Sequence, residues 1–103
     1  MLQFFFHRQW QKLRLRAREL RITLIGDIPI FTAHDSADVW ASPDLFELDD
    51  KGLPLVVAGV PPDFFSETGQ RWGNPLYRWT AHQAEHFDWW KARMRRVFEM
   101  VDV

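Results

Sequence analysis

The sequence predicts an α/β fold, because two adjacent patterns in its first third form one αβ step. Apolar side chains recur at helical spacing within residues 8–21, with charged residues between them, which indicates an amphipathic helix. A β-rich apolar run, residues 22–25, follows at once and is halted by Gly26 and Pro29. Such a run is typical of a strand buried on both faces, so we expect a parallel architecture, either an open sheet or a barrel. The apolar helix positions are Trp10, Leu13, Ala17 and Leu20.

The composition limits the class of protein. The chain has 103 residues, enough for one domain that buries roughly 65% of its unfolded surface. Its 13 basic and 14 acidic side chains give a net charge of -1, which disfavours nucleic acid and anionic membranes as partners. It has no cysteine, hence no disulfide framework and no thiolate metal site, which suits the cytosol. The apolar start is brief and interrupted by His7 and Arg8, so we expect neither a signal peptide nor a membrane span.

Short elements are expected in the middle of the chain. Asp35 and Ser36 are suitable N-cap residues and Pro43 is a suitable first helical residue, which together predict one or two short helical turns. Residues 46–57 read as a hairpin, in which two apolar-rich arms flank the turn residues 49–52.

A second amphipathic helix is expected from about His82 onward. Its apolar positions are Phe87, Trp90, Met94, Val97 and Val101. They follow one another at spacings of three and four residues. The final VDV is typical of the first residues of another strand. A (β/α)8 barrel takes about 250 residues, more than twice the length of this chain, so we expect the chain to be a fragment. Without the missing elements, the apolar face of this helix is expected to be exposed and to favour aggregation.

The segment VPPDFFSETGQRWGNPLY, residues 60–77, combines prolines with aromatic and short polar side chains. Sugars need both kinds of group, because a glucose ring presents C–H bonds on its faces and hydroxyls around its edge. Long loops are where such sites are found. A rigid, self-packed surface loop explains the same composition, so both interpretations stay open. The aromatic residues are Phe64, Phe65 and Trp72, and the polar ones are Asp63, Ser66, Thr68, Gln70 and Asn74.

Few other residues suggest a site. Asp27 follows the predicted strand, and ligands of parallel α/β folds bind at the carboxyl ends of strands, but a turn aspartate bonded to backbone N–H groups is the simpler explanation. His82 and His86 lie four residues apart, yet no third ligand has a suitable spacing, so no metal site is expected. His34 beside Asp35 fits a polar site or a helix cap equally well.

Several segments resemble consecutive segments of one enzyme family. They are GDIPIF, HDSADVW, VVAGVPPDFFSETGQRWGNPLYRW and FEMVDV, and together they span essentially the whole chain. The family is the 4-alpha-glucanotransferases of the amylomaltase type, also called disproportionating enzymes, glycoside hydrolase family 77. The resemblance implies a (β/α)8 TIM barrel of the alpha-amylase clan and a retaining enzyme that transfers α-1,4-glucan segments between sugars. It implies no cofactor, malto-oligosaccharides and other α-1,4-glucans as partners, and a cytoplasmic location.

The resemblance also implies roles for parts of the chain. Residues 1–103 would be part of the catalytic barrel domain, truncated at both ends, around the third strand GDIPIF and its long following insertion. Residues 43–80 would hold a hairpin and an active-site loop, in which residues 58–77 overhang the cleft as a mobile loop. The implied substrate-binding residues are Asp27, Asp63, Phe64, Gln70, Trp72 and Asn74. Many members carry a tyrosine where this chain has Phe64, which weakens the contact assigned to that residue.

The catalytic carboxylates are implied to lie outside this chain. In the family, the nucleophilic aspartate lies on the next strand, a few residues beyond VDV, and the general acid/base and the stabilising carboxylate lie on later strands. Retaining chemistry needs two carboxylates about 5 Å apart, so the isolated chain is expected to be inactive. The alternatives are a non-catalytic carbohydrate-binding fragment and the product of a truncated gene.

Overall fold

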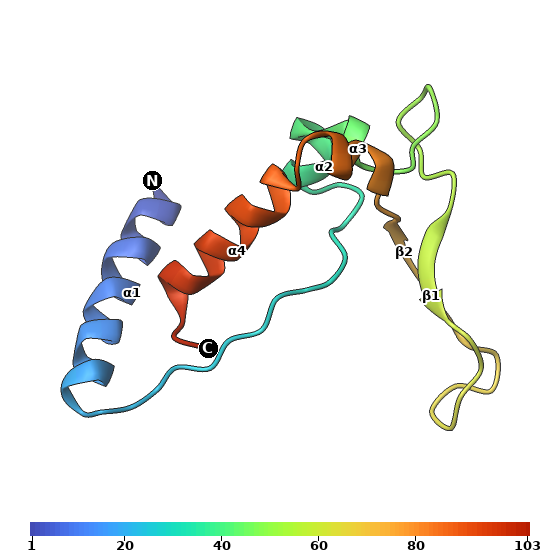
Figure 1. Cartoon of the computed structure of the whole chain (residues 1–103). Coiled ribbons are helices and arrows are strands. Elements are labelled where there is room, and N and C mark those ends of the chain that lie inside the picture. The colour runs from blue at the N-terminus through green and yellow to red at the C-terminus, as the bar shows by residue number, and fades with distance from the viewer. The chain divides into compact units, whose positions relative to one another are not determined.

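The protein, a computed structural model that describes residues 1–103, divides into two compact units. Residues 1–28 and 88–103 form the helical unit, and residues 29–87 form the hairpin unit. Figure 1 labels the elements along the chain. They are α1 (Leu2–Glu19), α2 (Ala37–Ala41), the 3-10 helix η1 (Pro43–Leu45), β1 (Val57–Val60), β2 (Gln70–Pro75), α3 (Trp79–Ala84) and α4 (Asp88–Met100). None of the helices combines the length and the apolar character that a membrane-spanning segment requires.

Helix α1 of the helical unit is longer than its apolar periodicity indicated. It begins at Leu2 instead of Arg8, because residues 2–7 contain neither glycine nor proline and extend the helix without a break. It ends through Arg21, which has a φ of 57°. The N–H groups of Arg21 and Ile22 donate to the carbonyls of Arg18 and Ala17 at 3.0 and 2.9 Å, which closes the last turn as a Schellman motif.

The prediction of a regular strand at residues 22–25 is wrong. These residues have no regular secondary structure, although they are extended beside the end of the chain. The carbonyl of Leu24 accepts bonds from the N–H groups of Asp102 and Val103 at 2.9 and 3.2 Å, and the N–H of Gly26 donates to the carbonyl of Val103 at 2.8 Å. The two segments run in the same direction, as parallel strands do, but the contact is too short to form a ladder.

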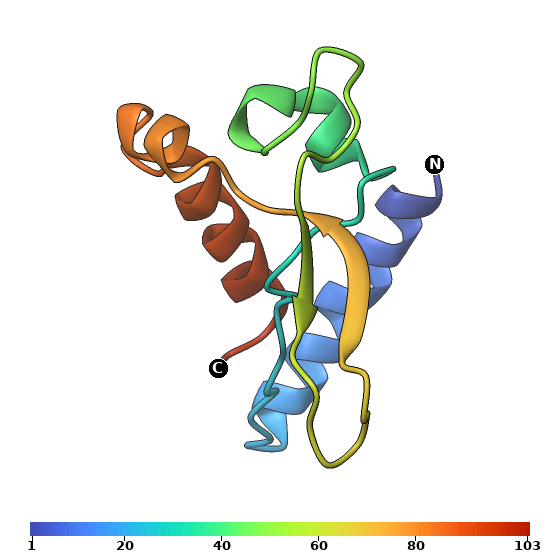
Figure 2. The same ribbon diagram turned by 90° about the vertical axis from the view of Figure 1, so that its right-hand side faces the viewer.

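Helices α1 and α4 lie side by side and run in a similar direction (Figures 1 and 2). The indole N–H of Trp10 donates to the carbonyl of Met100 at 2.7 Å. The buried guanidinium of Arg14 donates to the carbonyls of Phe98, Glu99 and Val101 and to the carboxylate of Asp102, the last at 2.8 Å. Polar contacts between side chains of α1 and the end of α4 therefore join these helices, with little apolar burial.

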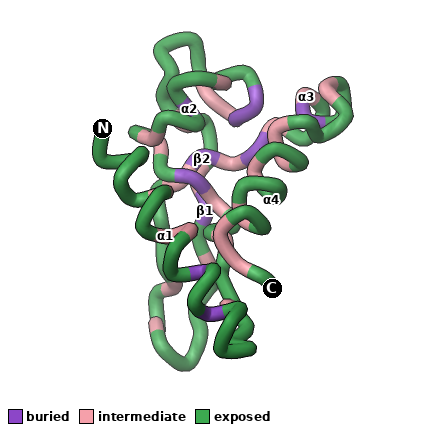
Figure 3. Tube along the Cα trace, turned by 90° about the vertical axis from the view of Figure 1, so that its left-hand side faces the viewer, coloured by how far each residue is buried: buried purple, intermediate pink, exposed green.

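The second amphipathic helix that the sequence predicted is two helices. His86 and Phe87 have φ angles of 56° and 59°, and the N–H of Phe87 donates to the carbonyl of His82 at 2.7 Å, so α3 ends before α4 begins. The hydrophobic period continues through this break, which is why periodicity alone missed it. None of the residues of α4 is buried (Figure 3), and Met94 is exposed, as expected for its apolar face, while Trp90 and Val97 are half-buried.

Aromatic rings form the core of the hairpin unit. Phe46 and His82 are fully buried and Tyr77 nearly so. The ring of Tyr77 lies 5.3 Å from that of Phe46, 5.4 Å from that of His82 and 6.1 Å from that of Phe31, measured between centroids. Nε2 of His82 lies 3.1 Å from the carbonyl oxygen of Leu45, so this nitrogen carries a proton. His82 is thus a packing residue of the core.

The two short helical turns and the turn at residues 49–52 are confirmed, with Ser36 and not Asp35 as the N-cap of α2. The expected hairpin over residues 46–57 is wrong at its second arm, because Val57 begins β1 and pairs with β2. Ser36 caps α2 by accepting a bond from the N–H of Val39 at 3.3 Å, and Pro43 is the first residue of η1. The turn at residues 49–52 brings Leu48 beside Pro54 in an antiparallel bridge. Oδ1 of Asp49 holds this turn by accepting bonds from the N–H groups of Lys51 and Leu53, both at 2.9 Å.

A second hairpin, β1 with β2, was not expected from the sequence. The two strands are antiparallel (Figure 2). Val60 lies opposite Gln70, and the pairing has a bulge between Val57 and Gly59. A Cβ on Gly59 would lie 2.3 Å from the carbonyl oxygen of Gln70, so only glycine permits this approach. Strand β2 contains Gly73 and Pro75, residues that disfavour strands, which explains why its local sequence gave no signal.

Asp102 makes the stability of the helical unit depend on pH. The N–H of Leu24 donates to Oδ2 of Asp102 at 3.1 Å, and this bond, followed by the one from Arg14, holds the pKa of Asp102 below its ordinary value of 3.8. A lowered pKa means that the carboxylate stabilises the fold at neutral pH and that this contribution disappears as the pH falls through the folded-state pKa. Asp102→Asn should lower the urea midpoint at pH 7, and this loss should shrink progressively as the pH falls below 3.8. Asp50→Asn, in an exposed turn, is the control, and a loss for Asp102→Asn that stays the same at every pH down to full protonation would contradict this role.

Candidate functional site

The most exposed aromatic side chains of the hairpin unit lie at the tip between β1 and β2. Phe64 is 96% exposed and Phe65 is 89% exposed, and their rings meet edge to face with centroids 5.6 Å apart. Two adjacent rings that stand free of the chain form an apolar surface for a ligand or another part of the protein. Both rings belong to the segment that the sequence indicated as aromatic, and Phe64 is the one that the family resemblance assigns to substrate binding.

Asp63 holds the backbone of this tip. Its Oδ1 accepts bonds from the N–H groups of Phe65 and Ser66 at 2.9 and 2.8 Å. The hydroxyl of Ser66 donates in turn to the carbonyl of Gly69 at 2.8 Å. These bonds fix the direction in which Phe64 and Phe65 project. Asp63 therefore has a structural role in the tip, and its contact with a glucan stays a prediction that concerns its second oxygen.

Gln70 and Trp72 come together on β2. Successive residues of a strand point to opposite faces, so residues two apart lie on the same face. The indole N–H of Trp72 donates to Oε1 of Gln70 at 3.0 Å, which orients the ring and leaves the amide nitrogen of Gln70 as a donor. Trp72 is 48% exposed, and the ring of Phe31 meets it edge-on at 6.3 Å. The pair offers an aromatic face with a polar group at its border.

Asn74, further along β2, is an anchor of the hairpin. Its amide nitrogen donates to the carbonyl of Thr32 at 2.9 Å, and the hydroxyl of Tyr77 donates to the carbonyl of Ile30, also at 2.9 Å. Both bonds satisfy backbone carbonyls of a segment that has no regular secondary structure. The predicted contact of Asn74 with a glucan therefore concerns its amide oxygen and the second hydrogen of its amide nitrogen.

Asp27 belongs to the helical unit and is described with it. Its side chain is exposed, and Oδ1 accepts a bond from the N–H of the next residue, Ile28, at 2.7 Å. This agrees with the turn interpretation of Asp27 and leaves its other oxygen open to solvent. Its combination with Gln70 and Trp72 in one site stays a prediction.

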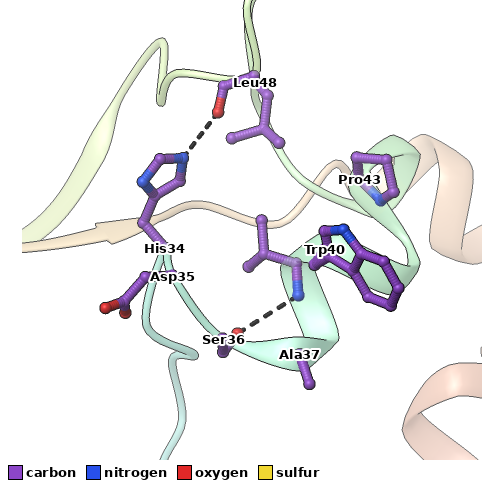
Figure 4. A pocket seen from close by; sticks show the side chains of 9 residues that line it. His34, Asp35, Ser36, Ala37, Trp40, Pro43 and Leu48 are labelled. Atoms are coloured by element: carbon purple, nitrogen blue, oxygen red, sulfur yellow. Dashed lines mark hydrogen bonds between the residues drawn. The ribbon is translucent and has the colours of Figure 1, made fainter.

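A separate hollow of about 550 Å³ lies between α2 and the turn at residues 49–52 (Figure 4). His34 stands at its side and its Nε2 lies 2.7 Å from the carbonyl oxygen of Gly52, while Trp40 is 85% exposed next to Pro43. The hollow is mainly apolar, and its histidine and serine are already bonded within the chain. The segment HDSADVW was noted in the sequence, but Trp40 was not singled out there. No group of three histidine, cysteine, aspartate or glutamate residues is arranged to hold a metal ion.

Comparison with known proteins gives one consistent result. A family model described as 4-alpha-glucanotransferase, glycoside hydrolase family 77, matches residues 1–103. Curated relatives of that name are 57% identical over 98 residues in Thermus thermophilus and 52% identical over 101 residues in Aquifex aeolicus. These matches cover 95% and 98% of this chain but only 20% and 21% of the relatives. A chloroplastic/amyloplastic 4-alpha-glucanotransferase of Solanum tuberosum is 52% identical over 100 residues, 97% of this chain and 17% of the relative.

A solved structure agrees with these relatives. It is an amylomaltase from Streptococcus agalactiae in complex with acarbose, with a TM-score of 0.93 and 47% identity. The match covers 97% of this chain and 20% of the amylomaltase chain. The chain thus spans about a fifth of the length of the proteins it matches. The chain belongs to the 4-alpha-glucanotransferase family, glycoside hydrolase family 77.

Proposed function

We propose that the chain is part of a 4-alpha-glucanotransferase that transfers α-1,4-glucan segments between malto-oligosaccharides. Within that enzyme, we propose that these residues bind the glucan. Family membership and the names of the relatives support the reaction, and the acarbose complex of the related amylomaltase supports an oligosaccharide as ligand. In this reaction an α-1,4 bond of the donor is cleaved with retention, and the released segment is joined to a hydroxyl of a second sugar. We include in the proposal a cytoplasmic location; plant relatives are named chloroplastic/amyloplastic.

The pair formed by Gln70 and Trp72 is the observation that supports glucan binding best. A half-exposed indole held by an amide presents a flat apolar face to the C–H bonds of a sugar ring, and the remaining amide donor lies beside that face. The exposed Phe64 and Phe65 add a second aromatic surface at the tip of the same hairpin. We assign Asp27, Asp63, Phe64, Gln70, Trp72 and Asn74 to substrate binding, with Asp63 and Asn74 mainly as supports of the hairpin.

We place the helical unit in a (β/α)8 barrel, around its third strand. The order of its parts supports this assignment, because α1, the extended residues 22–26, α4 and the extended residues 101–103 alternate as helix and strand do in a barrel. The parallel direction of the two extended segments is also the one that a barrel requires. Asp27 then follows a barrel strand at its carboxyl end, the end at which barrel enzymes bind their substrates.

The tip of the hairpin suggests how transfer could prevail over hydrolysis. A covalent glucosyl intermediate reacts with whichever hydroxyl reaches it, so an enzyme that favours a sugar acceptor must keep water away. Phe64 and Phe65 provide apolar surface that can cover a bound glucan, and the bonds of Asp63 keep this surface in one conformation. Residues 58–77 thus form the proposed cover, with a strand on each side of the tip.

Replacement of Trp72 by alanine tests the glucan-binding face. In the protein as its gene encodes it, Trp72→Ala should raise the KM for maltotriose about fivefold, because an aromatic contact is worth about 1 kcal/mol. The measurement is glucose release from maltotriose over a range of substrate concentrations. Trp40→Ala removes a more exposed indole outside the hairpin and should leave the KM unchanged. An unchanged KM for Trp72→Ala, or an equal rise for Trp40→Ala, would reject the assignment.

Replacement of Phe65 by serine tests the cover. Loss of the apolar ring should admit water, so the ratio of reducing ends formed to glucan transferred should increase several-fold. Both products can be measured in one reaction by separating the oligosaccharides. Leu53→Ser, a comparable change at an exposed turn of the same unit, should leave the ratio as it is. A Phe65→Ser variant with the original ratio would show that the tip does not exclude water.

A polypeptide of residues 1–103 alone should have no transferase activity. We propose that the chain contains no pair of carboxylates that could act as nucleophile and acid/base, and it spans about a fifth of its relatives. Incubation with maltotriose should therefore yield neither glucose nor longer oligosaccharides. Formation of either product by the purified polypeptide would contradict the proposal.

A further inference from the structure

The guanidinium of Arg14 closes the C-terminal end of α4. A helix leaves its last four carbonyls without partners, and side-chain donors can satisfy them. Nη1 of Arg14 donates to the carbonyls of Phe98, at 3.4 Å, and Glu99, and Nη2 donates to the carbonyl of Val101 at 3.3 Å. Because Arg14 lies on α1, the last carbonyls of α4 are capped by another helix, which also supplies the indole N–H of Trp10 to the carbonyl of Met100. The direction in which the chain leaves α4 therefore depends on Arg14.

Asp102 links Arg14 to the segment that precedes Asp27. Its Oδ1 accepts a bond from Nη2 of Arg14 at 2.8 Å, and its Oδ2 accepts one from the N–H of Leu24 at 3.1 Å. The carbonyl of Leu24 accepts a hydrogen bond from the N–H of Asp102 at 2.9 Å. Both backbone polar groups of Leu24 are therefore bonded to Asp102. One carboxylate thus joins α1, the end of α4 and residues 22–26.

Gly26, the residue before Asp27, also bonds to the end of the chain. Its N–H donates to the carbonyl of Val103 at 2.8 Å. A Cβ built on Gly26 would lie 2.8 Å from both methyl groups of Val101, so the glycine permits the two segments to pack closely. Restraints from residues 101–103 thus act on the backbone at Leu24 and Gly26, and Asp27 is the next residue.

We propose that Arg14 is a positioning residue for Asp27, acting through Asp102 and the backbone of Leu24 and Gly26. The inference rests on the proposed function, in which the carboxylate of Asp27 contacts the glucan. Arg14 touches no substrate; it sets where the strand end lies. Lysine cannot replace it, because one ammonium group cannot reach several carbonyls and a carboxylate in the fixed fork that a guanidinium provides. Arg18 lies 3.7 Å from the same carboxylate with a side chain that is 60% exposed, so it is a poor substitute.

The first test compares Arg14→Lys with Arg16→Lys in the protein as its gene encodes it, with maltotriose as substrate. Arg16 lies on the same helix and pairs only with the exposed Glu19, so its replacement controls for the loss of a guanidinium from α1. A displaced Asp27 binds the sugar less well, so Arg14→Lys should raise the KM about fivefold and change kcat by less than about twofold. Arg16→Lys should change neither. A residue that only stabilises the fold would reduce the amount of active enzyme and leave the KM of the folded molecules as it was.

A double-mutant cycle tests whether the effect passes through Asp27. Asp27→Asn should raise the KM about tenfold, the cost of a weakened hydrogen bond to a charged group. In the double variant, Arg14→Lys should raise the KM no further than Asp27→Asn alone, because the carboxylate that Arg14 positions is already absent. Full additivity of the two changes, or an unchanged KM in Arg14→Lys, would overturn the inference. Should Arg14→Lys fail to fold, Asp102→Asn takes its place, since it keeps the bonds of Arg14 to the carbonyls and should raise the KM in the same way.

The same cycle separates the inference from the proposed function. A raised KM for Asp27→Asn together with an unchanged KM for Arg14→Lys and Asp102→Asn rejects the positioning role and keeps Asp27 as a binding residue. An unchanged KM for Asp27→Asn rejects the binding role of Asp27, and the inference falls with it.

Discussion

Long segments without regular secondary structure oblige this chain to satisfy backbone polar groups with side chains. Backbone N–H and carbonyl groups need hydrogen-bonding partners, and residues 22–35, of which only Thr32 is buried, contain no helix or strand that would pair them. In the helical unit, the side chain of Asp102 accepts a bond from the N–H of Leu24. In the hairpin unit, the side chain of Tyr77 donates to the carbonyl of Ile30, and that of Asn74 donates to the carbonyl of Thr32. Each unit thus depends on a few polar side chains that come from distant parts of the sequence.

This constraint explains how the candidate site combines order with exposure. Phe64, Phe65 and Trp72 offer apolar surface to solvent, and they gain little from packing. Their positions are held instead by the bonds of Asp63 and Gln70. A binding surface needs accessible rings with few conformations, because ordering the rings during binding would reduce affinity. Polar bonds to the backbone provide this order without covering the rings.

Local signals were reliable where a residue acts on its own neighbours. Ser36 as a cap, Pro43 as a helix start and the turn at residues 49–52 were predicted from the sequence, because each depends on bonds within about four residues. The pairing of β1 with β2 was missed, and so was the break between α3 and α4. Neither has a local signature, since β2 contains Gly73 and Pro75 and the break occurs at His86 and Phe87 without a glycine.

The sequence by itself determined the family, through long motifs that span the chain, and the residue types available to the site. It also determined the short capped elements and the first helix, although not where that helix begins. Only the tertiary structure decided which polar groups were free. For Asp63 and Asn74 the sequence left glucan contact and a self-packed loop both open, and the structure shows that both residues hold the backbone. Arg14 was an ordinary charge on a helix until α4 lay beside it. The reason is physical: hydrogen bonds between residues far apart in the chain form only when the fold brings them together, so no local pattern in the sequence records them.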